Sequence, residues 1–401
     1  MKKPSADKTV IIPGFKFSSA SAGIKKPGKK DIALIFSETP AVTAGVFTTN
    51  KIKAAPVKLD IARISRKKLC QAIIINSGSA NACTGLQGLK DAKETAEITA
   101  KGLRISSELV CVASTGIIGR LLPMQKIKKA IPEAIKKLSP SAIRESALAI
   151  MTTDTFQKVY STKIKIGGKN GTIAGIAKGA GMICPNMATM LAFIVTDIAI
   201  ESAALDSALR GAVGKSFNRL TVDNDMSTND TVLVMANGML KNMPITKASP
   251  FYVKFEDALT GVSYNLSRMI ALDGEGATKL VEIIVRGAKT ETDAEKVAKS
   301  IANSMLVKTA IYGNDPNWGR IMAAIGYSGV RVDENKIDIS INRFKLVSKG
   351  AGIDKTKTPK DLFSGKEIFI TAELGLGKKE ARVLTCDLTE KYVKINADYT
   401  T

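Results

Sequence analysis

Residues 178–191 read Lys-Gly-Ala-Gly-Met-Ile-Cys-Pro-Asn-Met-Ala-Thr-Met-Leu, a glycine-rich turn that runs into an apolar strand. The chain contains no histidine, so the Ser–His and Cys–His pairs that usually activate a nucleophile are excluded. A hydroxyl in this segment therefore needs another base. If Thr189 became a new N-terminus, its own α-amine, with an ordinary pKa of about 7.7–8.0, could take the proton from its own hydroxyl.

The same threonine also has a simpler interpretation. A strand is predicted over residues 190–195, and β-branched residues such as Thr189 favour strands. A Gly-x-Gly pattern followed by an apolar run is common in proteins of many functions. On the residues alone an ordinary strand position is therefore favoured, and self-cleavage at Thr189 is the alternative.

Composition describes a folded chain in a reducing compartment. The length of 401 residues predicts two or three lobes, and 45% hydrophobic with 24% charged residues is close to the globular average. The five cysteines are scattered, with no Cys-x-x-Cys pair. This spacing, in a chain without histidine, argues against a metal site and against a secreted disulfide framework. We therefore expect a cytoplasmic protein.

The net charge of +22 is the unusual number. Lysines are spread along the whole length, aromatic residues make up only 5%, and no nucleic-acid-binding motif is present. No apolar run approaches the 18 residues of a membrane span, and the apolar run after the basic N-terminus is too short for a signal peptide. We interpret the charge as a solubility feature and expect neither nucleic acid nor membrane as a partner.

Two predicted strands end in turns rich in glycine and small polar residues. The strand at 72–75 leads into the loop 76–85, and the strand at 109–113 leads into Ser-Thr-Gly-Ile-Ile-Gly at 114–119. Such a turn can present backbone N–H groups or a hydroxyl to a developing oxyanion, or it can simply connect a strand to a helix. The pattern alone favours the simple connection.

Hydrophobic periodicity predicts a mixed α/β fold. The expected helices cover residues 89–103, 124–138, 141–151, 202–213, 250–269 and 292–305. A hairpin is expected at 163–176, strands and loops at 30–57, and further strands at 191–200, 280–285, 337–341, 367–372, 382–386 and 392–395. Residues 221–230 carry three aspartates, but the central glycine and terminal glutamate of a calcium loop are missing.

Several of these segments together resemble the ornithine acetyltransferase family, also called glutamate N-acetyltransferase. The similarity extends from about residue 12 to residue 401, and it is most specific at 178–191 and at the C-terminus. In that family the bond before the threonine of Met-Ala-Thr-Met-Leu is broken. The resemblance implies an ornithine acetyltransferase-like fold that is cleaved between Ala188 and Thr189, into an α chain of residues 1–188 and a β chain of residues 189–401.

The resemblance also assigns roles to individual residues. Thr189 is implied as the nucleophile, and Thr115 with Gly116 as the oxyanion hole. The implied substrate-binding residues are Thr152, Lys178, Thr189, Glu275, Asn396 and Thr401. We expect Lys178 to face a substrate carboxylate and Glu275 the side-chain amine of ornithine, because charges of both signs need partners once water is excluded. Asn224 stands where the family has a glycine, which predicts an altered turn.

The activity implied by the resemblance is acetyl transfer from N2-acetylornithine to glutamate, through an acetyl-Thr189 intermediate, in arginine biosynthesis. No cofactor is expected, and the motifs leave open whether acetyl-CoA serves as a second acetyl donor. The resemblance implies a heterotetramer of two α and two β chains. The alternatives are a self-processing N-terminal-nucleophile hydrolase or aminopeptidase, a basic nucleic-acid-binding protein and a non-catalytic scaffold.

Overall fold

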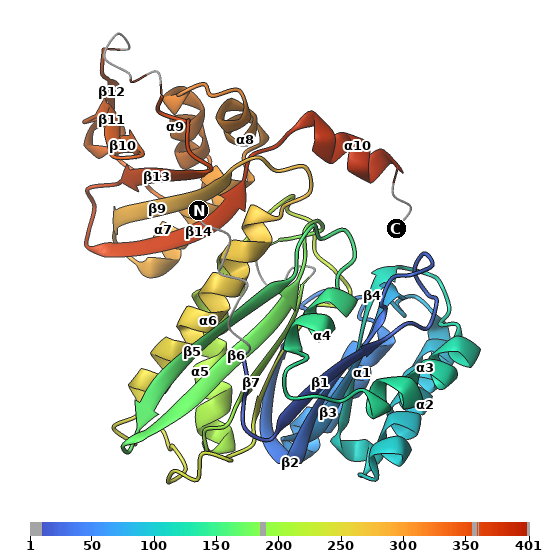
Figure 1. The fold of residues 1–401 in the computed structure, drawn as a ribbon. Coiled ribbons are helices and arrows are strands. Elements are labelled where there is room, and N and C mark those ends of the chain that lie inside the picture. The colour runs from blue at the N-terminus through green and yellow to red at the C-terminus, as the bar shows by residue number, and fades with distance from the viewer. Residues whose placement is uncertain (1–9, 185–189, 355–358, 360, 399–401) are drawn as a thin grey trace.

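The chain folds around two β-sheets, each packed against helices (Figure 1). The structure is a computed structural model, and it describes residues 10–184, 190–354, 359 and 361–398. Two lobes result, one around each sheet, within the range predicted from the length. Helix α6 (Tyr252–Leu272) packs against the first sheet and leads into the first strand of the second.

The first sheet takes strands from both sides of the Ala188–Thr189 bond. Its eight strands are β1 (Phe15–Ala20), β2 (Ile32–Phe47), β3 (Leu69–Ser79), β4 (Val110–Ile117), β5 (Lys158–Ile166), β6 (Lys169–Lys178), β7 (Leu191–Thr196) and β8 (Thr231–Ala236). Their order is β4-β3-β2-β8-β7-β6-β5, with β1 paired to β2. The pairs β3–β4 and β7–β8 are parallel, and the other neighbouring pairs are antiparallel.

Strand β7 is buried on both faces. Ala192 and Ile194 belong to the core formed with helices α5 (Ser202–Gly214) and α6, whereas Phe193 and Val195 belong to the core on the opposite face. A strand covered on both faces is apolar at every position instead of at alternate ones. The apolar run that follows Thr189 is therefore an interior strand of the first sheet.

The remaining helices of the first lobe lie around β1 to β4. They are α1 (Ala55–Lys67), α2 (Gly85–Leu103), α3 (Met124–Lys136) and α4 (Ile143–Ala149). In α2, Ala92, Ala96 and Ala100 recur every four residues and are buried in the core that α2 shares with α3 and β4. This spacing places them on one stripe of the helix, as the periodicity predicted.

The second sheet lies entirely after residue 279. Its strands are β9 (Leu280–Ala288), β10 (Asp338–Ile341), β11 (Phe344–Ser348), β12 (Ala351–Gly352), β13 (Glu367–Glu373) and β14 (Lys379–Cys386), in the order β12-β11-β10-β13-β9-β14. The helices of this lobe are α7 (Glu291–Asn303), α8 (Met305–Tyr312) and α9 (Trp318–Gly326). A last helix, α10 (Glu390–Asp398), follows β14 and extends to one side of the lobe (Figure 1).

The predicted strand at 392–395 is wrong, because these residues lie inside α10. A run of four residues is too short for its periodicity to distinguish a strand from a helix. The helical conformation places Tyr392 and Asn396 one turn apart, and both contact residues of the first lobe or the loop after α6. The site described below depends on this placement.

Other predicted boundaries are also wrong, among them the start of the loop expected at 76–85, because β3 continues to Ser79. The strands and loops expected over residues 30–57 give way to α1 at Ala55, where Pro56 occupies the first turn and its missing N–H removes no helical hydrogen bond. The strand expected over 191–200 ends at Thr196. There the Thr196 hydroxyl donates to the Thr172 carbonyl and Asp197 accepts from the Thr172 N–H, so side chains replace the next strand pairing.

Candidate active site

A pocket at one end of the first sheet brings together six of the predicted site residues. Thr115, Gly116, Thr152, Lys178, Glu275 and Asn396 all line it. They come from β4, from the loop after α4, from the end of β6, from the turn after α6 and from α10. The other predicted residues, Ala188, Thr189 and Thr401, lie outside the described residues.

Thr115 and Gly116 belong to a strand. The turn predicted at 114–119 is wrong at its start, because β4 continues to pair with β3 through Ser77–Thr115 and Gly78–Gly116. Gly116 has φ +134°, and a Cβ there would collide with the backbone of Gly78 and Ser79. Only glycine permits so close an approach of two strands, so the geometry of the sheet requires a glycine at position 116.

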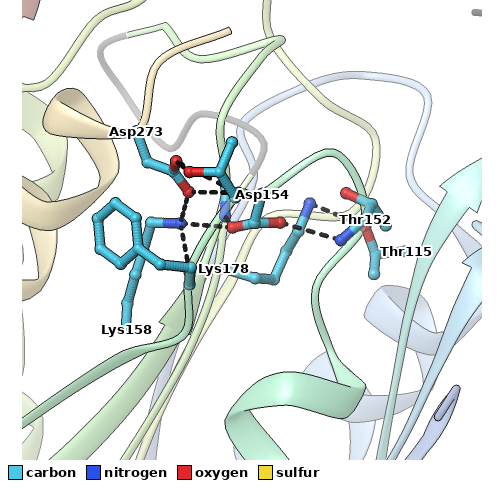
Figure 2. A network of polar contacts seen from close by, with 9 residues as sticks. Thr115, Thr152, Asp154, Lys158, Lys178 and Asp273 are labelled. Carbon is cyan, nitrogen blue, oxygen red and sulfur yellow. Dashed lines mark hydrogen bonds and ion pairs between the residues drawn. The ribbon is translucent and has the colours of Figure 1, made fainter. Parts of the chain in front are cut away.

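Lys178, the last residue of β6, reaches Thr115 across the pocket. Its Nζ donates to Thr115 Oγ1 over 3.3 Å, and both side chains are buried (Figure 2). Burial lowers the pKa of Lys178, although the charge of Asp154 acts in the opposite direction. An ammonium beside a hydroxyl in a buried site can bind a carboxylate or stabilise a negatively charged oxygen.

Glu275 lies in the turn after α6, close to the segment that carries Lys178. Its backbone N–H donates to the Ala180 carbonyl over 2.9 Å, and Gly181 packs so close to its carboxylate that a Cβ would not fit. Asn396 Nδ2 donates to Glu275 Oε2 over 2.9 Å. Among the described lining residues, the carboxylate is that of Glu275 and the ammonium is that of Lys178, and α10 is joined to the pocket through Glu275.

The threonines at 152–155 divide into two groups. Thr152 and Thr153 line the pocket, whereas the hydroxyl and N–H of Thr155 bind the carboxylate of Asp273. The Thr152 N–H donates to Asp154 Oδ2 over 2.9 Å, which fixes the start of this turn. The position predicted as the substrate contact, Thr152, is therefore on the pocket side.

Two aspartates of the 221–230 run hold the backbone on either side of residues 185–189. Asp223 accepts from the N–H groups of Met182 and Ile183, over 2.7 and 2.8 Å, and Asp230 accepts from the Met190 N–H over 2.9 Å. Burial raises the pKa of both carboxyl groups. In the described part of the chain, no group of three or more acidic, cysteine or histidine side chains is arranged to hold a metal ion.

Asn224 lies at the turn position where the resemblance has a glycine. Its φ is +65°, in the left-handed region that asparagine tolerates better than most residues. Asparagine can therefore occupy this position of the turn, and whether the turn differs from one with glycine stays a prediction. Tyr392 of α10 packs beside the same turn, with its hydroxyl 3.2 Å from Asp223 Oδ2.

Sequence reasoning missed Asn229, which lines the pocket, and a buried charged cluster next to it. The Asn229 amide donates to the carbonyls of Ala80 and Ser114, over 2.6 and 2.8 Å, and so joins the residue after β3 to β4. A second group consists of Asp154, Lys158 and Asp273, which form buried ion pairs (Figure 2). Asp154 belongs to the run Thr-Thr-Asp-Thr at 152–155, which includes the predicted Thr152. Nothing local in the sequence connects Lys158 to Asp273, a partner 115 residues away.

No helix among the described residues has the length and apolar character needed to span a bilayer.

Comparisons with known proteins identify the family of this chain. A family model described as the ArgJ family matches residues 16–401. Two relatives named "Arginine biosynthesis bifunctional protein ArgJ" cover nearly the whole chain. The relative from Geobacter sulfurreducens is 48% identical over 392 residues, which cover 97% of this chain and 100% of the relative. The relative from Syntrophotalea carbinolica is 50% identical over 394 residues, which cover 98% of this chain and 100% of the relative.

A solved structure gives the same assignment. The crystal structure of "Arginine biosynthesis bifunctional protein argJ" from Bacillus halodurans is 43% identical with a TM-score of 0.50. The match covers 52% of this chain and 98% of the solved chain. With identities near 50% across almost its entire length, the chain belongs to the ArgJ family.

Proposed function

We propose that this protein transfers the acetyl group of N2-acetylornithine to glutamate, through an acetyl ester on Thr189. The observation that carries the proposal is the pocket, where six residues implied by the family resemblance lie together although they are distant in sequence. Strand β7, which begins two residues after Thr189, belongs to the same sheet as Thr115 and Lys178. Membership in the ArgJ family, with relatives named for arginine biosynthesis, supports the same reaction.

The nucleophile is made by cleavage of the Ala188–Thr189 bond. Thr189 Oγ attacks the Ala188 carbonyl carbon, the C–N bond breaks, and the freed α-amine gains a proton. Water then hydrolyses the ester to leave the Ala188 carboxylate and a free Thr189 hydroxyl. The Bacillus halodurans structure supports this step. Nearly all of the chain in that structure matches only about half of this one, as expected of a fragment produced by such a cleavage.

The transfer then proceeds in two half-reactions. Thr189 Oγ attacks the acetyl carbonyl while its α-amine accepts the hydroxyl proton, and the C–N bond breaks to release ornithine with that proton. The glutamate amine attacks the acetyl ester, releases N-acetylglutamate and restores the hydroxyl. Thr115 and Gly116 provide the oxyanion donors, and losing one such donor typically costs about 10²–10³ in kcat.

The charges of the pocket fit a substrate that carries both signs. Lys178 would bind the α-carboxylate and Glu275 the side-chain ammonium of ornithine. Buried charge-assisted hydrogen bonds of this kind are stronger than those between neutral groups. Asn396 holds Glu275 in place from α10.

Four further features belong to the proposal. Acetyl-CoA acts as a second acetyl donor, which the word "bifunctional" in the names of the relatives supports. No resident cofactor is needed for either half-reaction. The cleaved chains assemble as a heterotetramer of two 1–188 and two 189–401 chains, and the protein works in the cytoplasm. Assays with labelled acetyl-CoA and light scattering of the purified protein test the donor and the assembly.

A labelled-acetyl assay tests the central reaction. Purified protein is incubated with N2-acetylornithine labelled in the acetyl group, with and without glutamate. We expect ornithine and labelled N-acetylglutamate in equal amounts when glutamate is present, and neither product from Thr189→Ala. Labelled free acetate as the main product in the presence of glutamate would indicate the self-processing hydrolase instead.

A further inference from the structure

A buried ammonium lies behind the pocket and connects several of its walls. Lys158, the first residue of β5, has a fully buried side chain. Its Nζ lies 2.6 Å from Asp154 Oδ1 and 2.6 Å from Asp273 Oδ2, and these carboxylates are themselves 0% and 2% exposed (Figure 2). Because water does not screen this cluster, its charges hold one another in a defined geometry.

Asp154 connects the cluster to two segments of the pocket through hydrogen bonds to their backbone. It accepts from the Thr152 N–H over 2.9 Å and from the Gly179 N–H over 2.7 Å. Gly179 directly follows Lys178, so one carboxylate places both Thr152 and Lys178. Burial alone would raise the pKa of Asp154, but Lys158, Lys178 and the Gly179 N–H together hold it below its usual range, so the carboxylate stays ionised.

Asp273 connects the cluster to a third segment of the pocket, the turn after α6 that carries Glu275. It is the first residue after α6, and it lies two residues before Glu275. A carboxylate at the C-terminal end of a helix is disfavoured by the helix dipole, and the Lys158 ammonium offsets this cost. Asp273 also accepts from the N–H of Thr155, over 3.0 and 3.2 Å, and from its hydroxyl.

We propose that Lys158 is a positioning residue that sets the separation between Lys178 and Glu275, and thereby the preference for acetylated amino acids whose side chain ends in an ammonium. This inference rests on the proposed function, because Lys178 and Glu275 hold the two charged ends of the substrate there. Lys158 does not line the described pocket, so it acts through Asp154 and Asp273.

Stability alone does not account for the cluster. Well-packed apolar residues of similar volume often replace a buried ion cluster without loss of stability, or with a gain. Asp154 instead binds the backbone of the segments 152–155 and 178–179, and Asp273 binds Thr155 and lies two residues before Glu275. A purely structural role would make Lys158 important for folding and unimportant for substrate preference.

The test compares Lys158→Met with Lys308→Met as a matched control. Lys308 is also a buried lysine, but its Nζ donates to Thr385 Oγ1 over 2.9 Å and to the Cys386 carbonyl, neither of which lines the pocket. Steady-state kinetics are measured with N2-acetylornithine and with N2-acetylnorvaline, which has the same carbon chain without the amine. For Lys158→Met we expect KM for N2-acetylornithine to rise about tenfold, with kcat changed less than about threefold.

The preference for N2-acetylornithine over N2-acetylnorvaline should fall by about tenfold in Lys158→Met and stay at the wild-type value in Lys308→Met. If Lys158→Met does not fold, as judged by circular dichroism, Asp273→Asn replaces it, because the asparagine side chain would keep an acceptor for Thr155 while losing the charge. A preference equal to that of the wild type in the folded variant would overturn the proposal. Wild-type protein that makes no N-acetylglutamate would instead remove the proposed function on which it rests.

Discussion

Asp230 binds the backbone immediately after the predicted cleavage site. Before cleavage Thr189 has no free α-amine, so the first step needs a base from elsewhere in a chain without histidine. Asp230 is fully buried, it accepts from the Met190 N–H, and burial raises its pKa well above the usual range although Lys178 opposes this. A carboxylate with a raised pKa is a stronger base than an ordinary one.

We therefore expect Asp230→Asn to slow self-cleavage by about tenfold or more, because asparagine keeps an acceptor for Met190 but takes up no proton. Denaturing gels over a time course after synthesis measure the uncut fraction. Asp225→Asn, at an exposed position of the same run, is the control and should cleave normally. Equal cleavage rates in the two variants would show that Asp230 only orders the backbone.

Glu275 carries a second prediction at the residue scale. Glu275→Gln keeps the shape of the side chain and an acceptor for Asn396, but it removes the charge that would face the ornithine ammonium. We expect kcat/KM for N2-acetylornithine to fall at least about tenfold, which corresponds to about 1.4 kcal/mol, while that for N2-acetylnorvaline changes little. An unchanged preference between the two donors would remove the assignment of Glu275.

At the scale of single elements, helix α1 supports the strand that carries Thr115. Both carboxyl oxygens of Asp60 lie within 3.2 Å of the Val112 nitrogen, and the side chain is buried between α1 and β4. Burial raises the pKa of Asp60 to about 8, although the Val112 N–H and Arg63 act in the opposite direction. The folded protein therefore keeps a proton that the unfolded chain releases at an ordinary pKa near 3.8.

Because the folded state binds more protons than the unfolded state, the stabilisation from Asp60 falls as the pH rises from about 4 to about 8, and it changes no further above 8. Asp60→Asn removes this titration. Urea unfolding of both proteins is measured at several pH values. Between about pH 4 and pH 8, the unfolding free energy of the wild type should fall relative to that of Asp60→Asn, by at most about 1.4 kcal/mol per pH unit. Parallel pH profiles for the two proteins would contradict the raised pKa.

The elements show how far sequence reasoning reaches. Helices α2 and α3 and the β5–β6 hairpin follow from periodicity and glycine turns, because those signals are local. Helix α10 was missed because the four residues 392–395 are too short a run to show a clear period. The roles given to Lys178 and Glu275 came from the family resemblance. No sequence pattern indicates that Lys158 pairs with Asp154 and Asp273, because these ion pairs form only in the folded chain.

At the scale of the whole molecule, the predicted cleavage products do not coincide with the two lobes. Residues 1–188 supply β1 to β6 of the first sheet, and residues 189–401 supply β7 and β8 together with the second lobe. Strand β7 lies between β6 and β8, and the β6–β7 pairs run from Ile173–Thr196 to Lys178–Leu191. A cut between residues 188 and 189 would break no backbone hydrogen bond of the β6–β7 and β7–β8 pairs, and it would remove no residue from the two apolar cores that β7 shares.

The two fragments should therefore stay together after cleavage. We expect them to co-elute in size-exclusion chromatography under native conditions, and to separate only in denaturant, because parting them would expose the interior strands β6 to β8. Gel analysis of each fraction makes the measurement. If the two fragments separated under native conditions, this would contradict a first sheet built from strands of both fragments.

The central claim is that Thr189 becomes the N-terminus of its own fragment and acts there as both nucleophile and base. Intact-mass measurement of purified, active protein tests it most directly. We expect two species with the masses of residues 1–188 and 189–401 in place of a single chain of 42.6 kDa, and an uncut, inactive chain from Thr189→Ala. An active protein with the full-length mass, or a Thr189→Ala variant that still transfers acetyl groups, would contradict it.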